Sequence, residues 1–233
     1  MKTIKSTIIS GRLQKNTSKI ISTIINVIAF ITISYASYLL VLLSIPYIHF
    51  QKNVEFLETK QLIYHINPWR YSFYIHVFSS PIVIIGGLLQ FNRSIMKRYS
   101  SLHRKVGYTY IITVLLISGP SAFIMSLYAT GGYIAQVSFV TLSVLWMLFT
   151  IQALRFAKNG NYESHVKWMI RSYALTLSAV TLRFYAYLFD YFNVDISPRE
   201  TYILLAYMSW IPNLIFSEFI IRKGYVRYLL SDR

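Results

Sequence analysis

Long apolar runs, separated by short polar connectors, constrain this sequence more than any other feature. Each run is near the length of about 20 residues that an α-helix needs to cross a bilayer. Charged residues make up only 13% of the 233 residues, and a soluble domain of this size could not bury so much apolar surface in one core. We therefore predict an all-α integral membrane bundle that forms a single membrane domain over residues 1–233. Its six spans are expected at about 20–45, 71–91, 108–128, 133–156, 168–189 and 201–221.

The first apolar run has basic residues before it, as a signal peptide has. Its length, about 20–45, exceeds that of a signal-peptide core, and no small-residue cleavage site follows it. We therefore interpret this run as an uncleaved span that follows a cytoplasmic segment, residues 1–19.

Lysine and arginine are distributed unequally between the two sides of the predicted bundle. The N-terminal segment, every second connector and the tail 222–233 carry 18 of the 23 Lys and Arg, whereas the opposite connectors carry 4. Because cytoplasmic loops are enriched in basic residues, both termini are predicted to be cytoplasmic. This placement accounts for the net charge of +15 and argues against nucleic-acid binding, since no soluble domain carries a basic face. The expected partner is the lipid bilayer.

Several kinds of chemistry are excluded or weakly supported by the residues present. The chain has no cysteine, which excludes disulfides, zinc thiolates, iron–sulfur clusters and cysteine nucleophiles. Motifs of metallohydrolases, serine hydrolases and dinucleotide-binding proteins are absent, and no span contains paired carboxylates. Gly86-Gly87 lacks the context of a phosphate-binding loop and predicts a close approach of two helices. Whether the protein is an enzyme stays open.

Two histidines, His103 and His165, precede the third and the fifth predicted span on the cytoplasmic side. These spans run in the same direction, so the two imidazoles are expected at similar depth. Two neutral imidazoles that face each other across a bundle can ligate a haem iron, and Arg104 and Arg171 would then neutralise the propionates. The alternative is that both histidines are interfacial and bind water or lipid phosphate.

A second pair of polar residues lies near the outer side of the predicted bundle. Arg183 lies within the fifth span, and His76 lies about one turn inside the second. With a rise of about 1.5 Å per residue, the two residues fall at comparable depth. A cation within hydrocarbon needs a partner. The pair therefore indicates either an outer site for a small anion, a quinone or a propionate, or a helix-locking contact of Arg183 with Asp190 or backbone carbonyls.

The remaining polar residues within spans favour contacts between helices. Gln90 and Asn213 are predicted to hydrogen-bond between helices, as membrane amides often do. Glu218 lies four residues before Arg222, which favours a local ion pair, and Arg171 is a second candidate partner for this carboxylate.

Several segments over residues 70–222 follow the pattern of a known family, and the block 165–174, His-Val-Lys-Trp-Met-Ile-Arg-Ser-Tyr-Ala, is the most specific. The other segments are His76, 86–91, 103–110, 181–183 and 210–218. They resemble the bacterial predicted membrane proteins catalogued as domain of unknown function 2306. The resemblance implies a multi-pass protein of the bacterial cytoplasmic membrane and assigns no activity.

The histidines also show a weaker resemblance to transmembrane b-type cytochromes of the ferric-reductase-like kind. That resemblance implies a four-helix core formed by spans two to five, with haem held by histidine pairs on alternate helices. His103 and His165 look like one pair, and His76 looks like half of another. The fourth span contains no histidine, and Gln136 near the expected depth is a poor haem ligand. At most one haem b is therefore implied.

Two functional hypotheses follow from the sequence. The first is a haem b electron carrier or quinone-linked reductase with a bis-histidine site near the cytoplasmic face. The second is a non-enzymatic membrane protein, such as a small transporter, a lipid-binding protein or an assembly factor, in which the His and Arg residues join helices. The absence of obvious broken helices or inverted repeats weakens the transporter version. A homodimer is a candidate assembly under either hypothesis.

Overall fold

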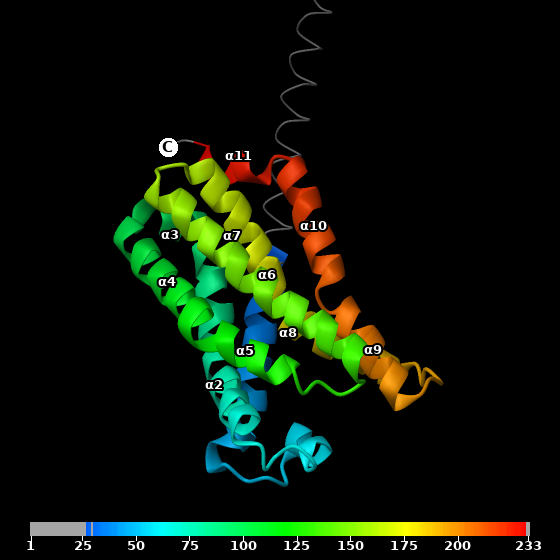
Figure 1. Ribbon diagram of the computed structural model, residues 1–233. Helices are drawn as coiled ribbons and strands as arrows, with labels where there is room; N and C mark the ends of the chain where they lie inside the picture. The colour runs from blue at the N-terminus through cyan, green and yellow to red at the C-terminus, as the bar shows by residue number, and fades with distance from the viewer. Residues whose placement is uncertain (1–26, 29, 232–233) are drawn as a thin grey trace, which may run out of the picture.

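The computed structural model describes residues 27–28 and 30–231, and these residues form a bundle of helices (Figure 1). No strand occurs within these described ranges. The prediction of an all-α membrane bundle is confirmed. The predicted cytoplasmic segment 1–19 and the beginning of the first span lie outside the described residues.

Five helices among the described residues are long and apolar enough to cross a membrane, and each overlaps a predicted span. Four of them have 24 to 27 residues, which exceeds the length of about 20 residues that the hydrocarbon core requires. The five helices are Phe30–His49, Asn67–Gln90, Ser100–Ser126, Tyr133–Lys158 and Pro198–Arg222.

The predicted span at 168–189 is not one continuous helix. It consists of α7 (Tyr162–Thr176) and α8 (Ser178–Tyr191), which meet at Leu177. With 15 and 14 residues, each helix alone is too short to cross a bilayer. Six spans and two cytoplasmic termini therefore stay predictions.

Other membrane helices are also irregular. The third contains a π-helical segment, η3 (Thr113–Ser118), between α4 (Ser100–Ile112) and α5 (Gly119–Ser126). The last is divided into α9 (Pro198–Met208) and α10 (Ile211–Arg222), near Pro212, which has no N–H group for the helical hydrogen bonds. The structure thus contains interruptions within membrane helices that are not obvious in the sequence.

The two ends of the bundle carry different short elements, and we name them by their places in Figure 1. The lower end carries two 3₁₀ helices, which follow the first helix (residues 30–44) and precede α2 (Asn67–Gln90). The upper end carries the C-terminal part of the chain. The short elements are η1 (Ile45–His49) and η2 (Glu55–Lys60) below, and α3 (Arg93–Arg98) and α11 (Tyr225–Leu230) above.

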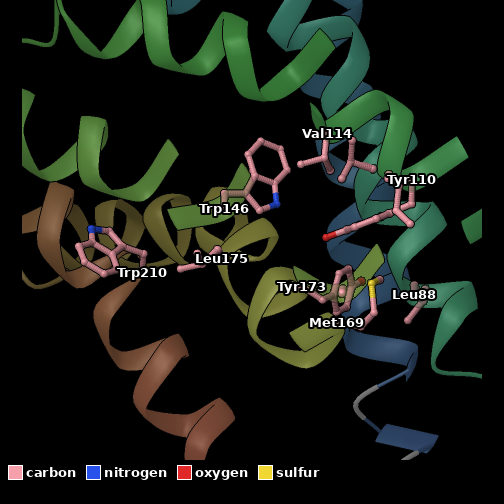
Figure 2. Packing of buried hydrophobic residues seen from close by; sticks show 11 residues of the cluster. Leu88, Tyr110, Val114, Trp146, Met169, Tyr173, Leu175 and Trp210 are labelled. Atoms are coloured by element: carbon pink, nitrogen blue, oxygen red, sulfur yellow. The ribbon is translucent and has the colours of Figure 1, made fainter. Parts of the chain in front are cut away.

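A core of large side chains joins α2, α4, α6 (Tyr133–Lys158) and α7 (Figure 2). Tyr173 of α7 packs directly against Gly87 of α2, where an added Cβ would lie 2.2 Å from the ring. The Tyr173 hydroxyl donates a hydrogen bond to the carbonyl of Ile84, at 3.1 Å. The Gly86-Gly87 pair therefore allows the close helix approach that the sequence predicts.

A buried hydroxyl cluster, formed by Tyr110, Thr150, Ser172 and Thr176, links α4, α6 and α7. The Tyr110 hydroxyl lies 2.8 Å from both Ser172 Oγ and Thr176 Oγ1, and Thr150 Oγ1 lies 2.7 Å from Ser172 Oγ. Trp146 Nε1 donates to Thr176 Oγ1 at 2.9 Å. Because every partner is buried, the cluster fixes the relative positions of the three helices.

Candidate functional site

A cavity of about 550 Å³ lies in the lower half of the bundle. Its walls come from the first helix, α2, α5, α6, α8 and α9, and η1 and η2 border its lower end. Most of the lining is apolar, and the volume is in the range of small-molecule sites. The apolar lining includes Leu40, Leu43, Trp69, Phe73, Leu142, Trp146 and Leu182.

His76 and Arg183, which the sequence predicts at one depth, both line this cavity. His76 Nδ1 lies 3.1 Å from the carbonyl oxygen of Ser118, at the end of the π-helical segment. If His76 donates this hydrogen bond as a neutral imidazole, its Nε2 is an acceptor. Arg183 is exposed to the cavity, and its Nη1 donates to the carbonyl of Ala179 at 2.8 Å. Arg183 thus uses a backbone carbonyl rather than Asp190.

Lys60 also lines the cavity, although it lies in a segment that reads as a polar connector in the sequence. Only 4% of the surface of this residue is exposed, and its Nζ donates a hydrogen bond to Thr130 Oγ1. The ammonium lies 4.9 Å from the ring centroid of Phe56 and 5.3 Å from that of Tyr202. Burial lowers the pKa of Lys60 to about 8. The cavity therefore contains a desolvated amine at its lower end.

Glu55 begins η2 and brings a carboxylate to the same cavity. Its φ of 49° is in the left-handed region, which is unfavourable for a residue with a side chain. The segment is held by Leu57, which is fully buried against Trp69 and Phe73. The apolar pair at 56–57, between two charged residues, is the sequence signal that would have indicated a packed segment rather than a solvated connector.

The charged groups of the cavity do not neutralise each other. Within residues 27–28 and 30–231, none of Glu55, Lys60 and Arg183 has an ion-pair partner within 4.0 Å. Charges in apolar surroundings are costly unless a partner or a ligand compensates them. Their placement around one cavity is therefore typical of a site that receives a charged ligand.

His103 and His165 are held at the upper end by different helices. His165 Nδ1 lies 2.8 Å from the carbonyl oxygen of Ala153 on α6. The backbone carbonyl of His103 accepts a hydrogen bond from Gln90 Nε2 on α2, at 2.9 Å. No group of three or more metal-ligating side chains occurs in the described part of the chain.

Packed side chains lie between α4 and α7 about two turns beyond His103 and His165. Tyr110 reaches from α4 to Ser172 on α7, and Tyr173 fills the gap to Gly87 on α2. Arg104, expected at a propionate, is exposed on α4. No contact in the described part of the chain supports a haem at this place.

Arg171 forms a contact between helices instead of a cofactor contact. Its Nε and Nη2 donate to the two oxygens of Glu218 on α10, at 2.5 and 3.1 Å. The guanidinium also lies 4.6 Å from the ring centroid of Trp168. Glu218 thus pairs with Arg171 across helices rather than with Arg222, its neighbour along α10.

Asn213 and Gln90 make the interhelical hydrogen bonds that the sequence predicts. Asn213 Nδ2 lies 3.2 Å from the Ala174 carbonyl, 3.0 Å from Thr181 Oγ1 and 3.1 Å from the Ser209 carbonyl. Thr181 Oγ1 also donates to the Ser209 carbonyl. Asn213 therefore joins the break between α7 and α8 to the break between α9 and α10.

Residues 73–221 match the family model described as Predicted membrane protein (DUF2306), which is more than half of the chain. The chain belongs to this family. Comparisons with curated proteins and with solved structures gave no match, so the likeness to b-type cytochromes gains no support. In this DUF2306 protein, the matched segment contains His76 and Arg183, whereas Glu55 and Lys60 precede it.

Proposed function

We propose that this DUF2306 protein is a non-enzymatic lipid-binding or lipid-transporting protein whose cavity holds an amphipathic lipid with a phosphate-containing head group. The observation that carries the proposal is one cavity that combines apolar walls with Lys60, His76 and Arg183. The two cations would attract the head group, and the walls would solvate an acyl chain at about 0.8 kcal/mol per CH₂ buried. The uneven distribution of Lys and Arg favours a cavity in the outer half of the membrane.

The interrupted helices support a lipid-handling role. Thr176, Ser178 and Ser209 lie at the breaks near Leu177 and Trp210, and all three line the cavity. Interruptions within membrane helices are typical of sites that bind or move polar groups at membrane depth. The described part of the first helix exposes many large apolar side chains, which favours entry of a lipid beside it.

A quinone is a second candidate for the same cavity. The rings of Trp69, Phe73 and Trp146 provide flat apolar surfaces, and Arg183 and Lys60 can donate hydrogen bonds to quinone carbonyls. This candidate needs no haem between His103 and His165.

The test uses the two cavity tryptophans, Trp69 and Trp146, as reporters. Phosphatidylglycerol with brominated acyl chains is titrated, as a minor component, into the purified protein in detergent. We expect saturable quenching, and we expect Arg183→Gln to weaken the apparent affinity about tenfold, since about 1.4 kcal/mol of head-group interaction is lost. A brominated diacylglycerol, which has no charge, should bind much more weakly.

Two controls decide the outcome. Arg104→Gln removes an exposed charge from the upper end and should leave the affinity unchanged. Trp69→Phe combined with Trp146→Phe should remove most of the quenching, because Trp168 and Trp210 do not line the cavity. Equal quenching by the charged and the neutral lipid, unaffected by Arg183→Gln, would reject the proposal. Displacement by a soluble quinone analogue, but by no lipid, would favour the second candidate.

A further inference from the structure

The lower end of the cavity carries charges of both signs. Glu55 and Lys60 both come from η2 and line the same cavity as Arg183. A purely anionic head group would compensate the two cations but would leave the Glu55 carboxylate opposed by a like charge. Such juxtapositions disfavour a ligand and are a common source of specificity. A head group that has a cationic part as well would compensate all three charges.

The carboxylate of Glu55 is placed by local structure rather than by a neighbouring cation. Its residue adopts a φ of 49°, and the next residue, Phe56, donates its backbone N–H to the Tyr47 hydroxyl at 3.3 Å. Tyr47 also lines the cavity. An unfavourable backbone conformation held beside an uncompensated charge is a feature of ligand-binding positions.

The lower end also provides surfaces that suit an ammonium group. Lys60 already places its ammonium over the rings of Phe56 and Tyr202, at 4.9 and 5.3 Å from their centroids. Aromatic faces attract cations through the ring quadrupole, most strongly where water is excluded. With Tyr47 and Glu55 at the same end, a second ammonium would find both a carboxylate and a ring.

Resting on the proposed function above, we infer that the cavity selects phospholipids whose head group joins a phosphate to a primary amine, as in phosphatidylethanolamine. The phosphate would contact Arg183 and Lys60, and the ammonium would contact Glu55. Soluble phosphoethanolamine shares this head-group chemistry. The apolar walls that include Leu40, Leu142 and Leu182 favour the lipid as its source.

The inference is tested by comparing brominated phosphatidylethanolamine with brominated phosphatidylglycerol in the tryptophan-quenching assay. The wild-type protein should prefer phosphatidylethanolamine about tenfold. Glu55→Gln should abolish this preference by weakening the binding of phosphatidylethanolamine, whereas Arg183→Gln should weaken the binding of both lipids. Glu58→Gln is the matched control, because Glu58 lies on the same 3₁₀ helix, is exposed and does not line the cavity.

The outcomes separate the inference from the proposed function. If both lipids bind equally and Glu55→Gln has no effect, the head-group inference is overturned, while sensitivity to Arg183→Gln would still support lipid binding. If neither lipid quenches, both the inference and the proposed function fail. Soluble phosphoethanolamine should compete only weakly, and competition as strong as that of the lipid would overturn the assignment to a lipid. Equal thermal stability of wild-type and Glu55→Gln protein shows that a lost preference is not misfolding.

Discussion

Gly87 lies where two helix backbones approach with a tyrosine ring between them. A Cβ at this position would lie 2.2 Å from Tyr173 and 3.2 Å from Tyr110. Tyr173 cannot move freely, because its hydroxyl donates to the Ile84 carbonyl. The neighbouring Gly86 is different, since its nearest added contact would be 3.8 Å away. The two glycines of the pair therefore have unequal importance for packing.

We predict that Gly87→Ala destabilises the protein, because the ring of Tyr173 must leave its position. Overpacking of this kind costs about 1–3 kcal/mol. The measurement is the thermal midpoint of the purified protein in detergent. Gly86→Ala is the matched control and should change the midpoint little. Equal midpoints for the two variants would show that the close approach does not constrain the bundle.

We predict that Lys60→Met stabilises the protein at pH 7 while it weakens lipid binding. Burial lowers the pKa of Lys60 to about 8 from 10.5, so the folded state binds fewer protons than the unfolded state between these values. The contribution of Lys60 to the free energy of unfolding therefore rises with pH over this window. Below the window, Lys60 is protonated in both states, and burial of its charge is unfavourable. Thermal midpoints of wild-type and Lys60→Met protein should differ at pH 7 and converge toward pH 10. A constant difference would contradict the assignment.

The sequence predicts part of the cavity residues and misses others for a physical reason. The comparable depth of His76 and Arg183 follows from the rise per residue of a helix, because both residues lie inside apolar runs. Glu55 and Lys60 lie among polar residues, which are usually solvated in a connector. Their positions depend on the burial of Leu57 of η2 against Trp69 and Phe73, a tertiary contact that local composition does not reveal.

At the scale of elements, two interrupted helices are joined at their breaks by one amide. Asn213 lies within hydrogen-bond distance of Ala174, Thr181 and Ser209. The break near Trp210 is explained by Pro212, which is visible in the sequence. The break at Leu177 has neither proline nor glycine near it, so the apolar run predicts a continuous helix. Beside this break, the Ala174 carbonyl and Thr181 Oγ1 accept hydrogen bonds from Asn213 of α10, which are contacts that only the folded chain provides.

We predict that Asn213→Leu lowers stability, because the acceptors at both breaks lose their shared donor. Loss of buried hydrogen bonds of this kind costs about 1–3 kcal/mol. Thermal unfolding in detergent measures the change. Phe216→Leu, on the exposed face of the same helix, is the matched control and should be nearly neutral. The prediction fails if the two variants unfold at the same temperature.

We predict a larger coupling energy for the Arg171–Glu218 pair than for an exposed ion pair. The two side chains are 21% and 38% exposed and join α7 to α10, so the pair is partly desolvated. A double-mutant cycle with Arg171→Met and Glu218→Gln should give about 1–2 kcal/mol, within the range of contacting residues. The exposed pair Lys167–Glu163 within α7 provides the reference and should give less than about 0.5 kcal/mol. Equal couplings would assign Arg171 a different role.

At the scale of the whole molecule, the number of membrane crossings depends on α7 and α8. If these two helices together cross once, the connector that contains Asp195 lies on the same side as η2. If they do not cross, Asp195 lies on the side of Gly160. The apolar runs predict the crossings, whereas the bend at Leu177 leaves one of them to be measured.

We predict six crossings, and the absence of cysteine makes the measurement direct. Single substitutions Leu62→Cys, Gly160→Cys and Asp195→Cys are labelled in intact cells with a membrane-impermeant maleimide. The first and third positions should react in intact cells, and Gly160→Cys should react only after permeabilisation. All three positions are exposed in the structure, so a lack of labelling reports sidedness. Protection of Asp195→Cys together with Gly160→Cys would establish five crossings.

The hydroxyl cluster of Tyr110, Thr150, Ser172 and Thr176 has a mechanical consequence. It fixes α4, α6 and α7 to each other at the upper boundary of the cavity. Below this cluster, α5 joins α4 through the π-helical segment η3, α8 joins α7 at a break, and α9 joins α10 at a break. These three joints are therefore the positions at which we expect the lower segments to tilt, while α4, α6 and α7 stay fixed at the cluster. Such tilting would change the width of the cavity without any helix sliding past another, which suits lipids of different cross-section.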